Sequence, residues 1–189
     1  LARHSMGLFV LFFGTKKKFN KIKHHTILFG KEYFELLEKI FKKHELPKDI
    51  SIYLHRPTAT DNSFAPNGCD SFYALVPVPN LLSKNIFWKK EASQFKEHVI
   101  NVLEKRLMKG LKKEIVHDFY MTPLDFKKNY LSDQGAGFSV APFFTQSAWF
   151  RFHNKSEVIN NLFLVGAGTH PGAGVPGVLS SAKVLESLL

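Results

Sequence analysis

The chain has 189 residues, of which 44% are hydrophobic and 22% charged, and its formal net charge is +10. These values are typical of one globular domain with a sizeable core. The single cysteine, Cys69, excludes an internal disulfide framework, and no stretch reaches the ~18 apolar residues that span a bilayer.

The positive charge is spread along the chain in short lysine groups such as 16–18, 42–43 and 112–113. No RNA-recognition or zinc-finger signature accompanies these lysines, so we predict no nucleic-acid partner and no metal site. A solvated basic face and a surface that attracts anionic membranes both remain open. The 19 phenylalanines favour either a large core or a surface for apolar partners.

The first third of the chain alternates strand and helix patterns. Residues 6–15 form a continuous apolar run, which predicts a buried strand, and residues 25–30 predict a second strand. Residues 31–44 predict a helix that ends before Pro47. Its expected apolar stripe consists of Phe34, Leu37, Ile40 and Phe41. Residues 49–55 alternate apolar and polar side chains, which predicts a half-buried strand.

The middle of the chain begins with a long loop at 56–71, rich in Pro, Asn, Asp and Ser. Residues 72–78 predict a strand, and Pro77 and Pro79 indicate either a sheet edge or the end of strand pairing. Residues 91–111 predict the longest helix, with its apolar stripe at Phe95, Val99, Val102, Leu103 and Leu107.

A strand at 114–120 and a helix at 122–131 follow, the helix with Thr122 as N-cap and Pro123 as first residue. Residues 161–166 predict a strand and residues 177–189 a terminal helix. The apolar residues expected on one face of that helix are Val178, Ala182, Leu185 and Leu189. The fold class is therefore α+β or α/β: a sheet with helices, without regular βαβ alternation, closed by a strand–glycine loop–helix unit.

The glycine loop "GAGTHPGAGVPG" (166–177) would join the carboxyl end of a strand to a helix N-terminus. Free N–H groups and the positive end of the helix dipole converge at such a place, which suits anions and electron-rich oxygens. Gly172, Gly174 and Gly177 match G-x-G-x-x-G, but the second strand and the acidic residue of a dinucleotide fingerprint do not fit in the twelve residues that follow. We therefore expect a cofactor contact without the adenosine half, or a turn without any ligand.

Four segments together resemble the bacterial phytoene desaturases, which are flavin-dependent carotenoid desaturases. They are "SIYLHRPTATD" (51–61), "GCDSFYALVPVPNL" from Gly68, "GAGFSVAPFFTQSAWFRFHN" (135–154) and "LFLVGAGTHPGAGVPGVLSSAKVLESLL" (162–189). The resemblance implies a two-domain FAD-binding flavoprotein similar to amine oxidases, with this chain as its C-terminal part. Residues 1–134 would belong mostly to the substrate-binding domain, and residues 135–189 would return to the FAD domain.

The activity that the resemblance implies is the removal of two hydrogens from a C–C single bond, which converts phytoene to neurosporene or lycopene with FAD as oxidant. The isolated chain is expected to be inactive and to bind FAD weakly or not at all, because the adenosine half of the site is absent. A carotenoid isomerase or retinoid saturase on the same scaffold is one alternative. A basic binding module with a non-catalytic glycine loop is another.

The same resemblance assigns site residues. Gly168 and Thr169 would approach the FAD pyrophosphate, although amine oxidases often carry Glu where Thr169 stands, and 175–178 would lie at the isoalloxazine. The full set of expected FAD contacts is Gly166, Gly168, Thr169, Gly174, Val175, Pro176, Gly177 and Val178. The side chains expected to line an apolar substrate tunnel are Phe138, Phe143, Phe144, Trp149 and Phe150.

His170 is the one candidate catalytic side chain in the loop, and a structural role for it remains open. Phytoene dissolves in membranes. We therefore expect the protein to lie in the cytoplasm and to dock peripherally on the inner face of a membrane through its basic and aromatic surface.

Overall fold

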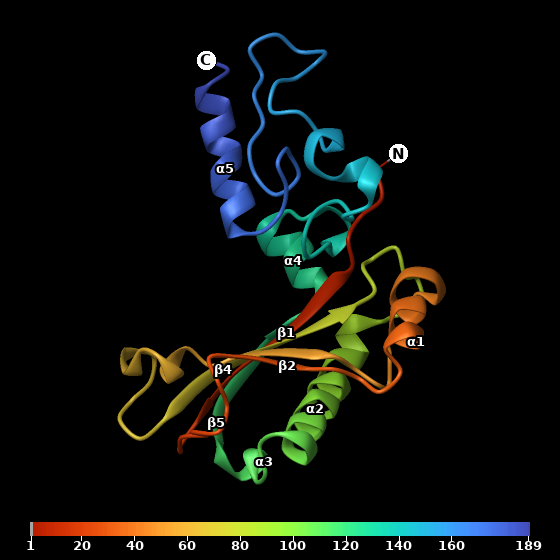
Figure 1. The fold of residues 1–189 in the computed structure, drawn as a ribbon. Helices are drawn as coiled ribbons and strands as arrows, with labels where there is room; N and C mark the ends of the chain where they lie inside the picture. The colour runs from red at the N-terminus through yellow and green to blue at the C-terminus, as the bar shows by residue number, and fades with distance from the viewer. Residues whose placement is uncertain (1) are drawn as a thin grey trace.

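The computed structural model describes residues 2–189. Its centre is one five-stranded antiparallel sheet with strand order β2-β3-β4-β1-β5 (Figure 1). The strands are β1 (Gly7–Thr15), β2 (His25–Leu28), β3 (Ile52–His55), β4 (Asp70–Val78) and β5 (Ile115–Met121). The predicted combination of a sheet with helices is confirmed, as a mixed α/β fold built on a single antiparallel sheet.

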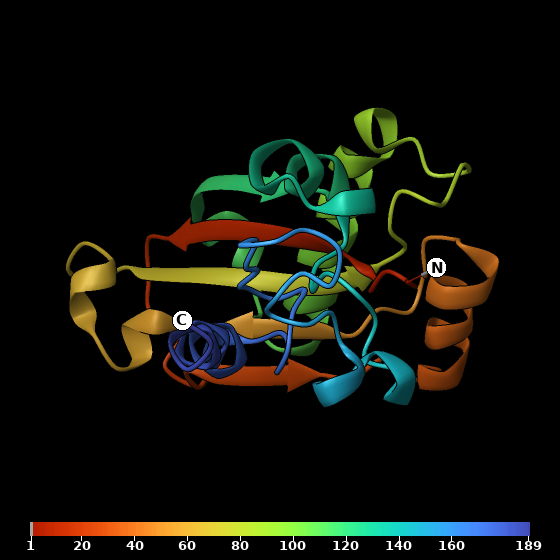
Figure 2. The same cartoon turned by 90° about the horizontal axis from the view of Figure 1, so that it is seen from above.

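The helices lie on both sides of this sheet. They are α1 (Tyr33–Glu38), α2 (Trp88–Arg106), α3 (Leu111–Glu114), α4 (Pro123–Tyr130) and α5 (Val175–Glu186). Helix α2 runs along one face, whereas α5 and the loops before it stand on the opposite side (Figures 1 and 2). In the part of the chain that the structure describes, no helix is long and apolar enough to cross a membrane.

The core fills the space between α2 and the sheet. Burial in β4 alternates strictly, as expected for a strand with one face turned inward. From α2, Phe95, Val99 and Leu103 are buried as the sequence predicts, and the ring of Phe95 meets that of Phe9 at 5.0 Å. Burial of this aromatic and aliphatic area is the main favourable contribution to folding.

The predicted apolar stripe of α1 is partly wrong. Leu36 and Ile40 are the buried residues, whereas Phe34 is 83% exposed and Phe41 44% exposed. The helix continues as a π-helical turn over Lys39–Lys43, which changes the angular spacing of side chains after Glu38. A strict 3.6-residue period therefore assigns Phe41 to the wrong side of the helix.

Pro77 in β4 and Pro79 just after it mark the end of pairing and not a sheet edge. Strand β4 lies between β3 and β1, so the edge interpretation is wrong. Pro77 is in register with Leu8 of β1, but pairing with β3 stops at Leu75. A proline is tolerated at this position because no strand lies on that side, so no carbonyl there loses a hydrogen bond from the N–H that proline lacks.

The long loop after β3 is held by a buried ion pair. Arg56 donates two hydrogen bonds to the carboxylate of Asp70, at 2.9 and 3.1 Å, and both side chains are buried. The hydroxyl of Thr58 and the backbone N–H of Phe19 complete the shell around Asp70, each at 2.7 Å. Two of the segments that carry the family resemblance thus meet in one satisfied polar network.

The C-terminal region departs from the sequence prediction at residues 161–166. No strand forms there, and a single bridge joins Phe163 to Lys155. The predicted strand is wrong because the run exchanges only two backbone hydrogen bonds with residues 154–156, and no strand among residues 2–189 extends this pairing into a ladder. The run is half exposed instead, with Val165 at 53%.

Helix α5 forms as predicted but begins two residues earlier, at Val175. Its only buried residue is Ser181. The apolar residues expected on one face are exposed or half-buried: Val178 is 37% exposed and Leu189 86% exposed.

Candidate functional site

The glycine loop makes a close approach between its own backbone and the first turn of α5. A Cβ atom at Gly177 would lie 2.6 Å from the carbonyl oxygen of Gly172. Gly172 and Gly174 have φ angles of 148° and 93°, in the region that favours glycine. The G-x-G-x-x-G spacing therefore has a packing role in this chain: it folds the loop tightly onto the helix N-terminus.

Two of the predicted FAD contacts, Thr169 and Gly166, take part in closing the loop. Thr169 is buried, and both its backbone N–H and its hydroxyl donate to the carbonyl of Gly166, at 3.2 and 3.1 Å. The N–H of Gly166 donates to Ser181 Oγ of α5 at 2.9 Å. Asn154 Nδ2 donates to Thr169 Oγ1 at 3.3 Å. Thr169 thus shapes the loop from the inside.

The outer side of the loop is open. A Cβ atom built at Gly166 or Gly174 meets no atom within 4 Å among the described residues. The first turn of α5 presents N–H groups beside this opening, since these have no partner within the helix. Nδ1 of His170 is buried without a hydrogen-bond partner in residues 2–189. Open glycine backbone, a helix N-terminus and a spare imidazole nitrogen fit a group that carries phosphates or carbonyl oxygens.

Arg151 is a structural centre that sequence reasoning missed. Its side chain is buried and donates only to backbone carbonyls: twice to Ala167, at 2.9 and 2.6 Å, and also to Gln146, Phe138 and Val140. Burial lowers the pKa of its guanidinium. An arginine flanked by phenylalanines in "WFRFHN" gave no sequence signal of this role. It joins the predicted tunnel segment to the glycine loop.

The five predicted tunnel residues lie on this segment and are all exposed to some degree. Phe138 is 39% exposed and lines a hollow of about 310 Å³ together with Pro171 and Gly172 of the loop. Trp149 and Phe150 line a second hollow of about 570 Å³. Phe143 and Phe144 are 46% and 82% exposed. The structure brings Phe138 next to the glycine loop, while the lining of a substrate tunnel stays a prediction.

A second aromatic surface, which the sequence did not reveal, crosses the sheet on the side away from α2. One register row contains His25, His55, Tyr73, Phe12 and Phe119, one from each strand. Their rings contact in sequence: His55 stacks on Tyr73 at 4.7 Å, and Phe12 stacks on Phe119 at 4.7 Å. We call these five residues the aromatic row.

The centre of the row borders a shallow apolar hollow of about 280 Å³, lined among others by Phe12, Tyr73 and Phe119. Burial, together with the neighbouring Tyr53 phenol, raises the pKa of Tyr73 to about 12. Burial and the nearby imidazoles of His24 and His25 lower the pKa of His55. Both shifts favour the neutral side chain, at Tyr73 and at His55. The row is 52% exposed at Phe119 and its rings suit apolar ligands.

Known proteins resemble the chain along nearly its full length. It is 46% identical over 187 residues to a lycopene-forming phytoene desaturase of Pantoea ananas. It is 51% identical over 190 residues to a neurosporene-forming phytoene desaturase of Cereibacter sphaeroides, and 48% identical over 191 residues to a lycopene-forming one of Pseudescherichia vulneris. No protein-family model matches the chain.

These matches cover 98–100% of the chain but only 36–39% of each relative. The chain thus spans a little over a third of the length of the curated relatives it matches. Over essentially all of its residues, the chain is homologous to the bacterial phytoene desaturases.

Proposed function

We propose that this chain contributes the substrate-facing sheet and the closing half of the flavin site to a phytoene desaturase. The reaction removes two hydrogens from a C–C single bond of phytoene and extends its conjugation toward neurosporene and lycopene. The observation that carries this proposal is the 46–51% identity, over nearly the whole chain, to proteins named for this reaction.

The architecture we propose has two domains, as in amine oxidases. Residues 1–134 would supply most of the substrate domain, and residues 135–189 would return to the FAD domain. The separation of the glycine loop and α5 from α2, on opposite sides of the sheet, supports this division. Arg151 would then fix the return segment, because its hydrogen bonds join residues 138–146 to Ala167.

FAD would be held by the loop and the start of α5, with Gly168 and Thr169 toward the pyrophosphate and residues 175–178 toward the ring. Gly166 and Gly174 would be further contacts. When bound, the flavin would supply the two-electron oxidation. The open space at Gly166 and Gly174 and the N–H groups of α5 support these roles. His170 has an unpartnered Nδ1 in the loop, and an N–H at this atom would donate a hydrogen bond to an oxygen of such a group.

The hydrocarbon would lie along aromatic side chains, since it offers almost nothing for hydrogen bonding. We propose two surfaces for it: the aromatic row on the sheet, and the segment that carries Phe138, Phe143, Phe144, Trp149 and Phe150. The rings would orient the polyene and exclude water from it. The pKa shifts of Tyr73 and His55, which both favour the neutral side chain, support this role.

The alternatives are less well supported. The relatives named above are all desaturases, which favours desaturation over isomerisation or saturation on the same scaffold. A basic binding module would not need the row of stacked rings on the sheet face away from α2.

We also propose that the protein works in the cytoplasm, docked on the inner face of a membrane. The reason is that phytoene is dissolved in the membrane. The net charge of +10 and exposed apolar residues such as Val158 and Leu179 support docking on anionic lipid. Flotation with anionic and neutral liposomes at low salt tests this. Binding to anionic vesicles is expected, and no binding to either contradicts it.

A chimera tests the function directly. The segment of the Pantoea ananas desaturase that aligns with this chain is replaced by the chain, and the purified protein is incubated with phytoene. We expect bound flavin and coloured, more conjugated products, as from the parent enzyme. A folded chimera that binds flavin but leaves phytoene unchanged would contradict the proposed function. A folded chimera without flavin would contradict the cofactor roles of the loop.

A further inference from the structure

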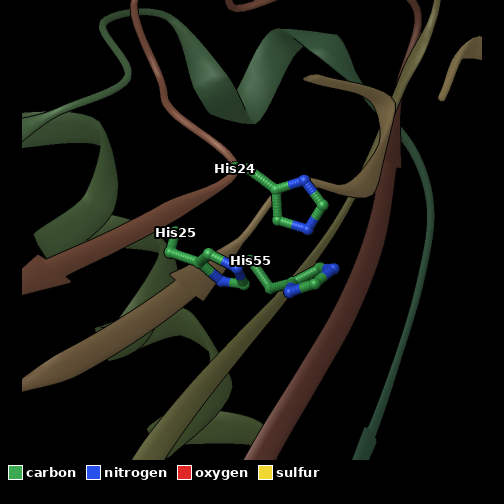
Figure 3. A group of neighbouring side chains, drawn as sticks. All are labelled: His24, His25 and His55. Carbon is green, nitrogen blue, oxygen red and sulfur yellow. The ribbon is translucent and has the colours of Figure 1, made fainter. Parts of the chain in front are cut away.

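Three histidines that do not belong to the glycine loop meet at one corner of the sheet. His24 ends the connection between β1 and β2, His25 begins β2, and His55 ends β3 (Figure 3). One ring nitrogen from each lies within 4.8 Å of those of the other two. The ring centroids are 4.4 to 5.3 Å apart.

The backbone fixes this arrangement. His25 and His55 are direct partners in the antiparallel pairing of β2 with β3, which sets their Cβ atoms side by side. The N–H of Arg56 donates to the carbonyl of His24 at 2.9 Å, so the third histidine is tied to the same corner. Arg56 is itself held by the buried carboxylate of Asp70.

Each of the three rings is oriented by a hydrogen bond at its own Nδ1 atom. Nδ1 of His24 contacts Thr60 Oγ1 at 2.8 Å, and the Thr60 hydroxyl already donates to the carbonyl of Pro57 at 3.3 Å. The hydroxyl must therefore accept from His24, which puts the proton of that ring on Nδ1 and leaves the Nε2 lone pair free.

The hydroxyl of Tyr53 orients the rings of His25 and His55 in the same way. It contacts Nδ1 of His25 at 2.7 Å and Nδ1 of His55 at 3.2 Å. A phenol has one proton to donate, so at least one of these imidazoles donates its Nδ1–H and carries a free Nε2 lone pair. Within residues 2–189, none of the three Nε2 atoms has a hydrogen-bond partner.

We propose that His24, His25 and His55 form a binding site for a divalent transition-metal ion of the Zn²⁺ type. Three neutral imidazoles are a common zinc ligand set, with a fourth position left for water. Thr60 and Tyr53 supply the outer hydrogen bonds that fix the tautomer of such ligands. The cluster contains no carboxylate, which disfavours Mg²⁺ and Ca²⁺.

Binding requires a small closure of the cluster. Ligand nitrogens on a tetrahedral ion lie roughly 3.3 Å apart, closer than the present limit of 4.8 Å. His25 is exposed and His24 is half-buried, so both rings can turn without disturbing the core. The ion would tie the connection before β2 to the end of β3, at one end of the aromatic row.

Isothermal titration of the tag-free, EDTA-treated and dialysed chain with ZnCl₂ tests the site. We expect one Zn²⁺ per chain with a Kd of roughly 10 μM or tighter, no binding of Mg²⁺, and a melting temperature raised by roughly 5 °C at saturation. His24→Ala and His25→Ala should each weaken binding at least about tenfold, and Tyr53→Phe by about 10–100-fold.

The matched control is His117→Ala, which removes an exposed histidine of β5 outside the cluster. It should bind Zn²⁺ like the unchanged chain. Far-UV circular dichroism without metal checks that each variant is folded. If a histidine variant does not fold, Tyr53→Phe still tests the site, because it keeps all three histidine ligands. No saturable Zn²⁺ binding would overturn the proposal, and so would equal weakening by His25→Ala and His117→Ala.

Discussion

The guanidinium of Arg151 donates two hydrogen bonds to the carbonyl of Ala167, at 2.9 and 2.6 Å, and thereby joins the aromatic segment to the glycine loop. Replacing it by methionine, Arg151→Met, keeps a long apolar side chain but removes the donor of four part-buried or buried carbonyls. We expect the free energy of unfolding to fall by about 2–4 kcal/mol, measured by urea denaturation.

The control for this variant is Arg106→Met, because Arg106 donates to the carbonyl of Phe29 in an exposed setting. Its effect should stay within about 0.5 kcal/mol. Equal losses for the two variants would show that Arg151 does not hold the loop.

Among the polar interactions around the sheet, the buried pair of Arg56 and Asp70 should be the one whose disruption lowers the free energy of unfolding most. Asp70→Ala leaves the arginine charge buried and unpaired, so we expect a loss of about 3–5 kcal/mol in unfolding free energy. Asp118→Ala, which breaks the more exposed pair with Lys96, should cost less than about 1 kcal/mol. Chemical denaturation of both variants decides the point, and a mild Asp70→Ala would contradict it.

Gly177 should resist replacement although it lies in a helix. Gly177→Ala gains up to about 1 kcal/mol of helix propensity, but its Cβ would lie 2.6 Å from the carbonyl oxygen of Gly172. Such overpacking costs about 1–3 kcal/mol, so the net effect should be destabilising. Hydrogen exchange across 166–177 should become faster than in Ser180→Ala, an exposed substitution on the same helix. Unchanged exchange would mean that the close approach is not needed.

Tyr73 should ionise late, at about pH 12. Because the folded pKa is raised above the ordinary value near 10, its stabilising effect is complete below pH 10 and is lost as the pH rises through 12. An alkaline absorbance titration measures this, and Tyr73→Phe should remove the latest step of the curve. If that variant leaves the step in place, the phenol is not shielded by the aromatic row.

The spacing of apolar residues predicted the strands of the antiparallel sheet and the helices packed on it, because each has a neighbour that buries one of its faces. It failed at 161–166, where an apolar run has no strand beside it, and at α1, where a π-helical turn changes the spacing. The glycine loop could be located from its composition. The aromatic row could not, because its five residues come from five strands and meet only through the register of the sheet.

The same limit applies to the histidine cluster and to Arg151. His24 and His25 are separated from His55 by 30 residues, and nothing in a single sequence pairs them. A buried arginine that bonds only to carbonyls leaves no partner to search for. Both require the backbone path to be known first.

We propose that the aromatic row holds the apolar substrate, and phytoene conversion by the Pantoea chimera tests this role most directly. Phe119→Ala in that chimera should lower kcat/KM for phytoene by about tenfold or more while the flavin stays bound, since a ring of this size contributes about 1.5–3 kcal/mol of apolar contact. Phe34→Ala removes a more exposed ring from α1 and should leave conversion unchanged. If both variants convert phytoene at the parent rate, the row does not hold the substrate.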